Sequence, residues 1–382
     1  MAKYTEFYRG RRKKRNYALI PSIIILGLIS VGVVLFYSMQ KYAVISKDGV
    51  ETVLPILQDE NTIIDEEGNE VRVFDTVDAQ IVFEKPDYSS VKATAGKYLD
   101  GVRAIFVPSA NINQQKLDEY AARLQSGNAL VLEMKPRSGV LMWNSTASEA
   151  QNYGMNVTTE ITNMMPQLIA ALKEKDIYLV AQISCCIDEL YASRSTTVTL
   201  RTEYGANYMD VNGTWLDPYN ISVRNYTVQL VKELFNLGFD EVVLADVAHP
   251  VLPTDTEQPV KLVYTRSMST EPNPINAVCG FASYVAEQLR DVEGTLSIYC
   301  DSKPALVRPD ETNGQDATLF MKLYDRVYLS TDKFAYPYNV TDMEPNVEIG
   351  DVHDRLVPVV INYLPDNTSW VLIDQEEKTG DD

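Results

Sequence analysis

Trp215-Leu-Asp-Pro-Tyr-Asn220 and Gly238-Phe-Asp-Glu-Val-Val-Leu-Ala-Asp246 are the two stretches that decide the fold. The first is a polar, aromatic turn that leads into a helix, which we expect over 221–237. The helix leads into an apolar strand over 241–246 that ends in a carboxylate. This order is half of a β/α repeat. Barrel enzymes built from such repeats carry their chemistry at the carboxyl ends of the strands.

The same alternation of strands and helices fills the chain from about 99 to 375. We expect an eighth strand around 334–345 and seven clear strands at 102–108, 128–135, 177–184, 241–246, 295–300, 326–330 and 369–373. Helices are expected at about 114–125, 158–174, 221–237 and 275–291. Continuous apolar strands separated by helices are typical of a parallel sheet buried on both faces. The predicted fold class is α/β, a (β/α)8 TIM-like barrel of regular or irregular form.

A doubly wound sheet is the alternative fold. Nucleotide-binding sheets of that kind have a glycine-rich turn after the first strand, and Pro108-Ser-Ala-Asn-Ile-Asn113 has no glycine. The segment 185–219 is too long for a plain connection, and loops of that length are often functional. We therefore favour the barrel.

Charge is distributed unevenly along the chain. The 382 residues have a net charge of −19, but residues 1–17 hold seven basic residues and a single acidic one. The remainder has 27 basic and 52 acidic residues, a net charge of −25. A body this acidic repels phosphate backbones, which argues against nucleic acid as a partner.

Residues 18–37, ALIPSIIILGLISVGVVLFY, are twenty residues without a charge. A helix of that length crosses a hydrocarbon core of roughly 30 Å. The basic tail 1–17 would stay in the cytoplasm, which places the rest of the chain outside. A cleaved signal peptide is the alternative, but its apolar core is usually shorter and ends at a small-x-small site, which Phe36-Tyr-Ser-Met-Gln40 does not provide. We expect a single-pass anchor in the cell membrane, with the lipid bilayer as a partner.

Residues 38–98 differ from the barrel pattern. The segment 42–54 alternates around Asp48-Gly49, and the segment 61–74 turns at Gly68-Asn69. Both are hairpin signals, so we expect a small β-rich stalk here. An acidic tail, 376–382, follows the barrel.

The four cysteines are Cys185, Cys186, Cys279 and Cys300, and none forms a C-x-x-C pair. The chain has two histidines, His249 and His353. This argues against a structural zinc site and favours buried free thiols. We expect no metal and no cofactor.

Acidic residues follow four of the expected strands, where a barrel would bring them to one mouth. Two carboxylates that flank a glycosidic bond can hydrolyse it, and we choose Glu133 and Asp246 as that catalytic pair. The expected substrate-binding groups are Asp217, Lys135, Asp188 and Asp301, with Trp215 and Tyr219 as platforms for sugar rings. Trp143 and Tyr191 are further aromatic candidates. The structural alternative is that these carboxylates cap helices.

Four segments appear in the order and spacing of a known family: 128–139, 177–188, Trp215-Leu-Asp-Pro-Tyr-Asn220 and 238–250. Over roughly residues 100–335 the chain resembles a bacterial glycoside hydrolase-like family of secreted or membrane-anchored TIM-barrel proteins. The resemblance implies a (β/α) barrel and a carbohydrate substrate.

The chain departs from the family pattern at the fourth strand, which usually ends F-D-Y-V-R-F-P and here reads Leu244-Ala-Asp-Val-Ala-His-Pro250. Ala245 replaces the strand-end Asp, Ala248 replaces the Arg, and Asp246 takes the Tyr position. Successive strand residues face opposite sides, so Asp246 could replace the lost acid only if a bulge shifted the strand.

Two other strands also differ from the family. Glu133 keeps an acid where the family has Asp, whereas Gln182 replaces an Arg. Loss of a cation and an acid together suggests that an ion-paired catalytic cluster has been dismantled. Two hypotheses remain open: a membrane-anchored extracellular glycoside hydrolase acting on a polysaccharide or cell-envelope glycan, and an inactive barrel that binds cell-wall glycan or an envelope protein.

Overall fold

The computed structural model describes residues 43–46, 49–52, 62–64, 70–72, 101–124, 128–253, 260–264, 273–330, 355–361 and 368–373. The chain divides into two compact units, Met1–Glu84 and Lys85–Asp382. The expected tail 1–17, anchor 18–37 and tail 376–382 lie outside the described residues. In the described ranges, no helix combines the length and apolar character needed to span a membrane.

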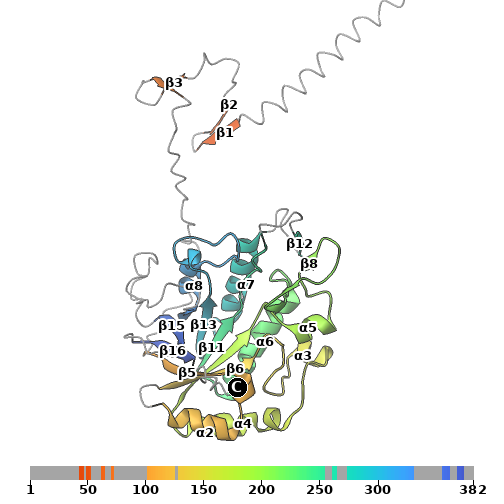
Figure 1. Cartoon of the computed structure of the whole chain (residues 1–382), viewed down its shortest axis with the longest axis vertical. Coiled ribbons are helices and arrows are strands. Elements are labelled where there is room, and N and C mark those ends of the chain that lie inside the picture. Colours follow the sequence, from red (N-terminus) through yellow and green to blue (C-terminus); the bar gives the residue numbers. More distant parts are fainter. Residues whose placement is uncertain are drawn as a thin grey trace, which may run out of the picture. The chain divides into compact units, whose positions relative to one another are not determined.

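The first unit contains two short antiparallel pairs (Figure 1). Strand β1 (Ala43–Ser46) pairs with β2 (Gly49–Thr52), and β3 (Thr62–Ile64) pairs with β4 (Glu70–Arg72). Both pairs lie where the sequence predicts hairpins, so their strands are confirmed.

The second unit is built on eight parallel strands that close into a barrel. In chain order these are β5 (Arg103–Val107), β6 (Ala129–Lys135), β7 (Tyr178–Ser184), β11 (Glu241–Ala245), β13 (Thr295–Cys300), β14 (Arg326–Ser330), β15 (Leu356–Ile361) and β16 (Trp370–Ile373). The last strand pairs with the first, in a register that places Trp370 beside Arg103. Closure confirms the barrel and rules out the doubly wound alternative.

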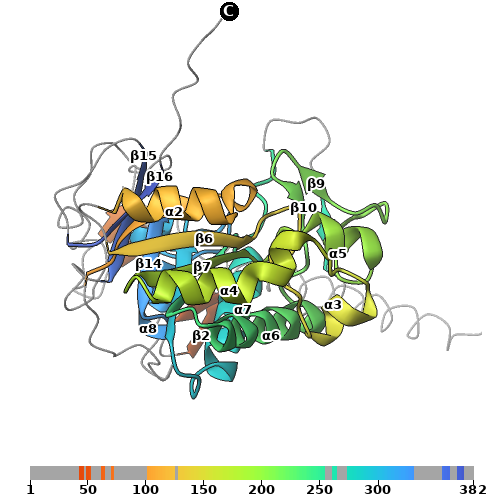
Figure 2. The same ribbon diagram turned by 90° about the horizontal axis from the view of Figure 1, so that it is seen from below.

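Helices alternate with the strands and pack on the outside of the barrel, as α2, α4 and α6 do in Figure 2. The helices are α2 (Gln114–Ala122), α3 (Ser148–Asn152), α4 (Glu160–Lys173), α5 (Glu189–Arg194), α6 (Ile221–Leu237), α7 (Pro274–Gln288) and α8 (Ala317–Leu323). Side-chain oxygens cap the amino ends of six of them, as the sequence favours at these positions. The caps are Asn113, Thr159, Asp188, Asn220, Asn273 and Asp316. Gly238 ends α6 at a φ of +111°, a backbone conformation that favours glycine.

The eighth barrel strand, β15, is not where the sequence analysis placed it. The region 334–345 lies outside the described residues, and the strand that completes the barrel is Leu356–Ile361. Pro358 lies in its middle, beside Leu329 of β14. Proline has no backbone N–H to donate to a neighbouring strand. A proline in a sequence therefore argues against a central strand at that position. The expected position of the eighth barrel strand, 334–345, was therefore wrong.

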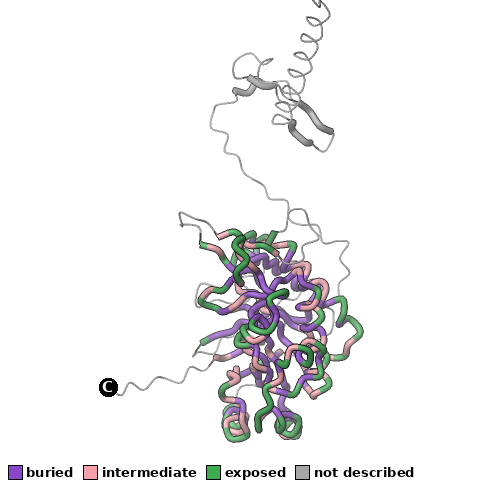
Figure 3. Tube along the Cα trace, turned by 90° about the vertical axis from the view of Figure 1, so that its right-hand side faces the viewer, coloured by how far each residue is buried: buried purple, intermediate pink, exposed green. Residues whose placement is uncertain are grey.

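Two layers of apolar side chains hold the barrel together. Small and β-branched residues fill the inside, among them Ala104, Val131, Val180, Val243 and Val357. A larger cluster lies between the strands and the helices, and buried positions accordingly fill the centre of the tube in Figure 3. This arrangement is that of other (β/α)8 barrels, whose interior is packed rather than open.

The four cysteines are free thiols, as the sequence predicts. Cys185, Cys186 and Cys300 are buried, whereas Cys279 is partly exposed. Burial raises the pKa of Cys186 to about 12, so this thiol stays protonated and unreactive near neutral pH.

A buried carboxylate occupies the amino-terminal end of the barrel interior. Glu241, the first residue of β11, accepts hydrogen bonds from the hydroxyls of Ser297 (2.6 Å), Tyr328 (2.8 Å) and Tyr178 (3.0 Å). It also forms an ion pair with Arg326, and both side chains are almost fully buried. Four partners on three other strands therefore join at one carboxylate.

Replacing Glu241 with alanine should lower the free energy of unfolding by about 3–5 kcal/mol, because it leaves the guanidinium of Arg326 buried without its partner. The matched control is Glu174→Ala at the exposed carboxyl end of α4, which should change stability by less than about 0.5 kcal/mol. Urea denaturation followed by circular dichroism measures both. Equal stability of the two variants would contradict a structural role for the buried cluster.

Candidate active site

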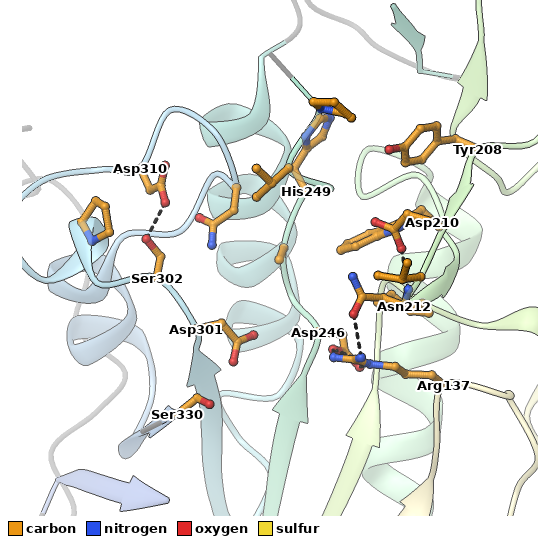
Figure 4. A pocket seen from close by; sticks show the side chains of 18 of the residues that line it. Arg137, Tyr208, Asp210, Asn212, Asp246, His249, Asp301, Ser302, Asp310 and Ser330 are labelled. Atoms are coloured by element: carbon orange, nitrogen blue, oxygen red, sulfur yellow. Dashed lines mark hydrogen bonds and ion pairs between the residues drawn. The ribbon is translucent and has the colours of Figure 1, made fainter. Parts of the chain in front are cut away.

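A cleft opens at the carboxyl ends of the barrel strands. Its deep part is a cavity of about 330 Å³, and its outer part is a cavity of about 690 Å³. Both are lined by Arg137, Asp246, Asp301 and Ser330, so they are continuous. We call this space the mouth cleft (Figure 4).

The deep part of the mouth cleft is built from inward-facing positions at the strand ends. Residues of this kind on five strands line it: Glu133, Lys135, Gln182, Ser184, Ala245, Tyr299, Asp301 and Ser330. On β7 and β11 they continue the inward alternation of Val180 and Val243 in the barrel core. The alternation thus runs from the valines of the interior to polar groups at the mouth.

Glu133 and Asp246, the expected catalytic pair, line the same cavity. Glu133 accepts two hydrogen bonds at Oε2 from Ser109, one from the backbone N (2.9 Å) and one from Oγ (2.8 Å). In the described part of the chain, Oε1 of Glu133 receives no such bond. Beyond Glu133 a bulge shifts the pairing of β6 with β7, so that Lys135 lies beside Ile183.

Asp246 reaches the cleft through a backbone turn. Strand β11 ends at Ala245, and Asp246 follows with a φ of +54°, in the left-handed region. In a regular strand, successive side chains face opposite sides. The left-handed conformation breaks this alternation, so Ala245 and Asp246 both line the deep cavity. A bulge within β11, as the sequence analysis required, is not needed. Asp is among the few residues other than glycine that adopt this region readily.

Arg137, in the loop after β6, holds Asp246. Its Nη2 lies 2.7 Å from Oδ1, and its Nε lies 3.1 Å from Oδ1 and 3.2 Å from Oδ2. Its Nη1 donates to Oδ1 of Asn212 at 3.0 Å. Burial acts to lower the pKa of Arg137, but the hydrogen bonds and charge of Asp246, together with the charges of Asp301 and Asp210, outweigh burial and raise it.

The mouth therefore contains an ion pair of a cation with an acid. Because Ala245 and Gln182 replace charged residues of the family pattern, the sequence suggests that such a cluster has been dismantled. The structure places a pair in the same cavity from other positions, Arg137 and Asp246. These two charges come from a loop and from a residue just beyond a strand, whereas the two family positions hold Ala245 and Gln182.

Lys135 and Asp188 form a second, fully buried ion pair below the cleft. The Nζ of Lys135 lies 2.8 Å from Oδ2 of Asp188 and donates to the carbonyl oxygen of Ser184 at 2.6 Å. The other oxygen of Asp188 accepts from the backbone N of Tyr191 at 2.7 Å and caps α5. Asp188 is fully buried, so this carboxylate supports the floor of the cleft from behind.

The remaining expected site residues divide into two groups. Asp301 and Trp215 line the mouth cleft, although Trp215 is only 5% exposed and forms part of a wall. Asp217 is fully buried and accepts from the backbone N of Tyr219 at 2.9 Å, holding the turn that precedes α6. Tyr219 packs edge-on against Tyr264 with ring centroids 5.0 Å apart. Neither Asp217 nor Tyr219 is among the residues that line the cavities.

Two aromatic candidates serve the core instead. Trp143 donates from Nε1 to Glu233 at 3.0 Å, and the hydroxyl of Tyr191 donates to Glu149 at 2.8 Å. Both rings are at least 95% buried, so neither presents a face to the cleft. The expectation that they are sugar platforms is corrected: they are large apolar groups that the core buries.

Several lining residues had no role in the sequence analysis. They are Arg137, Tyr208, Asp210, Asn212, His249, Tyr299, Ser302 and Asp310. All of them except Tyr299 are labelled around the cleft in Figure 4. Two features of the sequence could have identified some of them as site residues. Arg137 lies just after the second strand, and Asp210 lies in the unusually long segment 185–219. Burial lowers the pKa of His249 to about 4, which leaves its ring neutral near pH 7.

Comparison with known proteins gives one family and a shared fold. Residues 104–349 match the sequence model of a family described as "putative glycosyl hydrolase domain". The PgaB (BpsB) glycoside hydrolase domain from Bordetella bronchiseptica superposes with a TM-score of 0.52 and 11% identity, covering 72% of this chain and 94% of that one. A hypothetical protein from Ruminiclostridium thermocellum ATCC 27405 has a TM-score of 0.43 and 21% identity, covering 51% and 96%. No curated protein matches the sequence.

Gly139→Ala should disturb the floor of the cleft. A Cβ at this glycine would lie 1.9 Å from Oδ1 of Asp188, and Gly139 has a φ of +82°. The matched control is Gly205→Ala, where φ is also +82° but no atom lies within 4 Å of the new Cβ. We expect Gly139→Ala to lower the free energy of unfolding by about 1–3 kcal/mol more than Gly205→Ala does. Equal losses in denaturant titrations would show that Asp188 can move aside freely.

Proposed function

This chain belongs to the family described as "putative glycosyl hydrolase domain", and we propose that it hydrolyses the O-glycosyl bonds of a polysaccharide or cell-envelope glycan in the mouth cleft. One observation carries the proposal. Glu133, Asp246 and Asp301 come from three different strands and line the same cavity at the carboxyl ends of the barrel strands. Barrel enzymes carry their catalytic groups at that end.

The contacts of the two carboxylates favour different roles for them. The guanidinium of Arg137 contacts both carboxylate oxygens of Asp246, which fixes the orientation of this carboxylate in the cleft and suits a nucleophile or a general base. Glu133 is bonded through one oxygen only, and its Oε1 can carry the proton that the leaving oxygen takes up. As the glycosidic C–O bond breaks, that proton would pass from Glu133 to the departing sugar. Asp246 would attack the anomeric carbon or activate a water molecule.

A second candidate function is glycan binding without turnover. Ala245 contributes no functional group at a strand end of the deep cavity, and the carboxylate of Asp246 is already engaged by Arg137. A barrel of this kind would bind cell-wall glycan or an envelope protein at the same mouth. Saturable glycan binding by the full-length protein, with no new reducing ends released, would identify this function.

Glu133→Gln and Asp246→Asn should each lower the rate of glycan hydrolysis by roughly a hundredfold to ten-thousandfold, because each removes an acid–base or nucleophilic group and keeps the shape of the side chain. The measurement is the release of reducing ends from a panel of bacterial polysaccharides. Asp291→Asn, an exposed carboxylate in the loop before β13, is the control and should retain full activity. Unchanged turnover in both site variants, with thermal unfolding as in the parent protein, would eliminate this pair.

We also propose that residues 18–37 anchor the protein in the cell membrane with the barrel outside. The support is the twenty-residue uncharged run and the basic cluster in 1–17 that precedes it. The strongly acidic remainder of the chain fits a position away from the anionic cytoplasmic leaflet.

The full-length protein should remain in the membrane pellet after washing with alkaline carbonate, and a protease added to intact cells should degrade the barrel. A variant without residues 1–37 should appear in the soluble fraction. Amino-terminal sequencing of the mature protein is the check on cleavage. A mature chain that begins after residue 37 and is released to the medium would show a signal peptide in place of an anchor.

A further inference from the structure

The outer part of the mouth cleft has a wall in which two aromatic residues and a carboxylate lie on one hairpin. Tyr208, Asp210 and Trp215 all line the outer cavity, and we call them the aromatic–acidic corner. They come from one small hairpin, β9 (Met209–Asp210) and β10 (Gly213–Thr214), and the residues that flank it. The backbone N of Trp215 donates to the carbonyl oxygen of Tyr208 at 3.1 Å, which pairs the two residues across the hairpin. In Figure 4, Tyr208 and Asp210 stand on the wall opposite Asp301 and Asp310.

The contacts of the corner leave groups available for a ligand. Oδ1 of Asp210 accepts from the backbone N of Asn212 at 2.7 Å, and the structure gives its Oδ2 no partner among the described residues. Trp215 is 95% buried, and its Nε1 has no hydrogen-bond partner in that same part of the chain. A buried indole N–H without a partner is costly. This N–H has almost no accessible surface, so a ligand oxygen would satisfy it only after a small shift of the indole ring.

The charge of the mouth cleft selects which ligands can enter. Of the described residues, five acidic ones line it: Glu133, Asp210, Asp246, Asp301 and Asp310. Three basic residues do so: Lys135, Arg137 and Lys303. The buried Asp188 balances Lys135, Asp246 balances Arg137, and His249 is neutral near pH 7 because burial lowers its pKa to about 4. The cleft is therefore negative, and it repels uronic acids and phosphorylated sugars.

A carboxylate that shares a cavity wall with aromatic residues can bind an ammonium group. The carboxylate provides a charge-assisted hydrogen bond, and the rings provide cation–π attraction. Sugar rings also pack on aromatic faces, so one hexosamine unit can use all three residues of the corner. A neutral hexose would use the rings but leave the carboxylate without a matching charge.

We propose that the aromatic–acidic corner binds the ammonium group of a hexosamine unit, so that the mouth cleft takes a polysaccharide with free amino groups. This inference rests on the proposed carbohydrate function of the cleft and adds the class of sugar. Asp210 is the residue that distinguishes the amine from an N-acetyl group or a hydroxyl. The parts of Tyr208 and Trp215 that line the outer cavity contact the sugar beside it.

The test compares sugars that differ only at C2. Isothermal titration calorimetry of the full-length protein measures affinity for glucosamine, N-acetylglucosamine and glucose, and for their β-1,4-linked tetrasaccharides. We expect the amino sugars to bind about tenfold more tightly than either counterpart, since a charge-assisted pair contributes about one such factor. The preference should shrink in 1 M salt, because the ion pair is partly exposed. Equal affinity across each series, or no binding of any sugar, would overturn the proposal.

Asp210→Asn identifies the residue responsible. The substitution keeps an Oδ1 that can accept from the backbone N of Asn212, so the hairpin retains its turn, but it removes the charge. We expect the tenfold preference for amino sugars to fall to about twofold or less. Asp291→Asn removes the same charge from an exposed loop before β13 and should keep the full preference. An unchanged preference in Asp210→Asn would show that another group selects the amine.

The outcome for hydrolysis is separate from the outcome for sugar class. Binding is measured without turnover, and the Glu133→Gln variant can be used where the parent protein consumes the tetrasaccharide. A preference for amino sugars without release of reducing ends would support this inference and contradict hydrolysis. Hydrolysis of neutral glycans with no preference for amino sugars would support the proposed hydrolysis and contradict this inference.

Discussion

Closure of the eight-stranded barrel is the constraint on which the rest of the structure depends. The pairing of β16 with β5 forces all eight parallel strands to end on one rim, so groups distant in the sequence become neighbours there. Glu133 and Asp246 share a cavity for this reason. At the other end, Glu241 joins four partners through buried hydrogen bonds and an ion pair. The carboxylates at the two ends of the barrel therefore differ. Glu241 is buried and fully hydrogen-bonded, whereas Glu133 and Asp246 line a cavity.

The chemistry of the mouth depends on a few local departures from regular structure. A left-handed residue, Asp246, adds a carboxylate beyond the end of β11, where a continued strand would have turned it away. A bulge in β6 separates Glu133 from Lys135, and Gly139 lets the next loop approach Asp188 closely. The loop residue Arg137 then pairs with Asp246. Such conformations are costly in isolation, and the packed barrel holds them in place.

The long segment 185–219 gives the mouth its outer wall. It contributes the β9–β10 hairpin, and Arg137 ties that hairpin to the strand ends through Asn212 at 3.0 Å. The deep cavity and the outer cavity meet at this arginine. A change in the position of the hairpin would therefore alter the contact of Arg137 with Asp246. A ligand in the outer cavity would lie close to the residues that line the deep cavity.

The sequence by itself determined seven barrel strands, four long helices and the candidate pair Glu133 and Asp246, because apolar periodicity and residues at strand ends are local signals. It did not place β15 correctly: this strand has Pro358 in its middle, and only its pairing with the neighbouring strands identifies it as part of the barrel. Only the tertiary structure decided which polar residues face the cleft. Asp217 and Asp301 look alike in sequence, yet one is buried in a turn and the other lines the cavity. Orientation depends on backbone angles and on packing against residues far away in the chain, and neither is written in local composition.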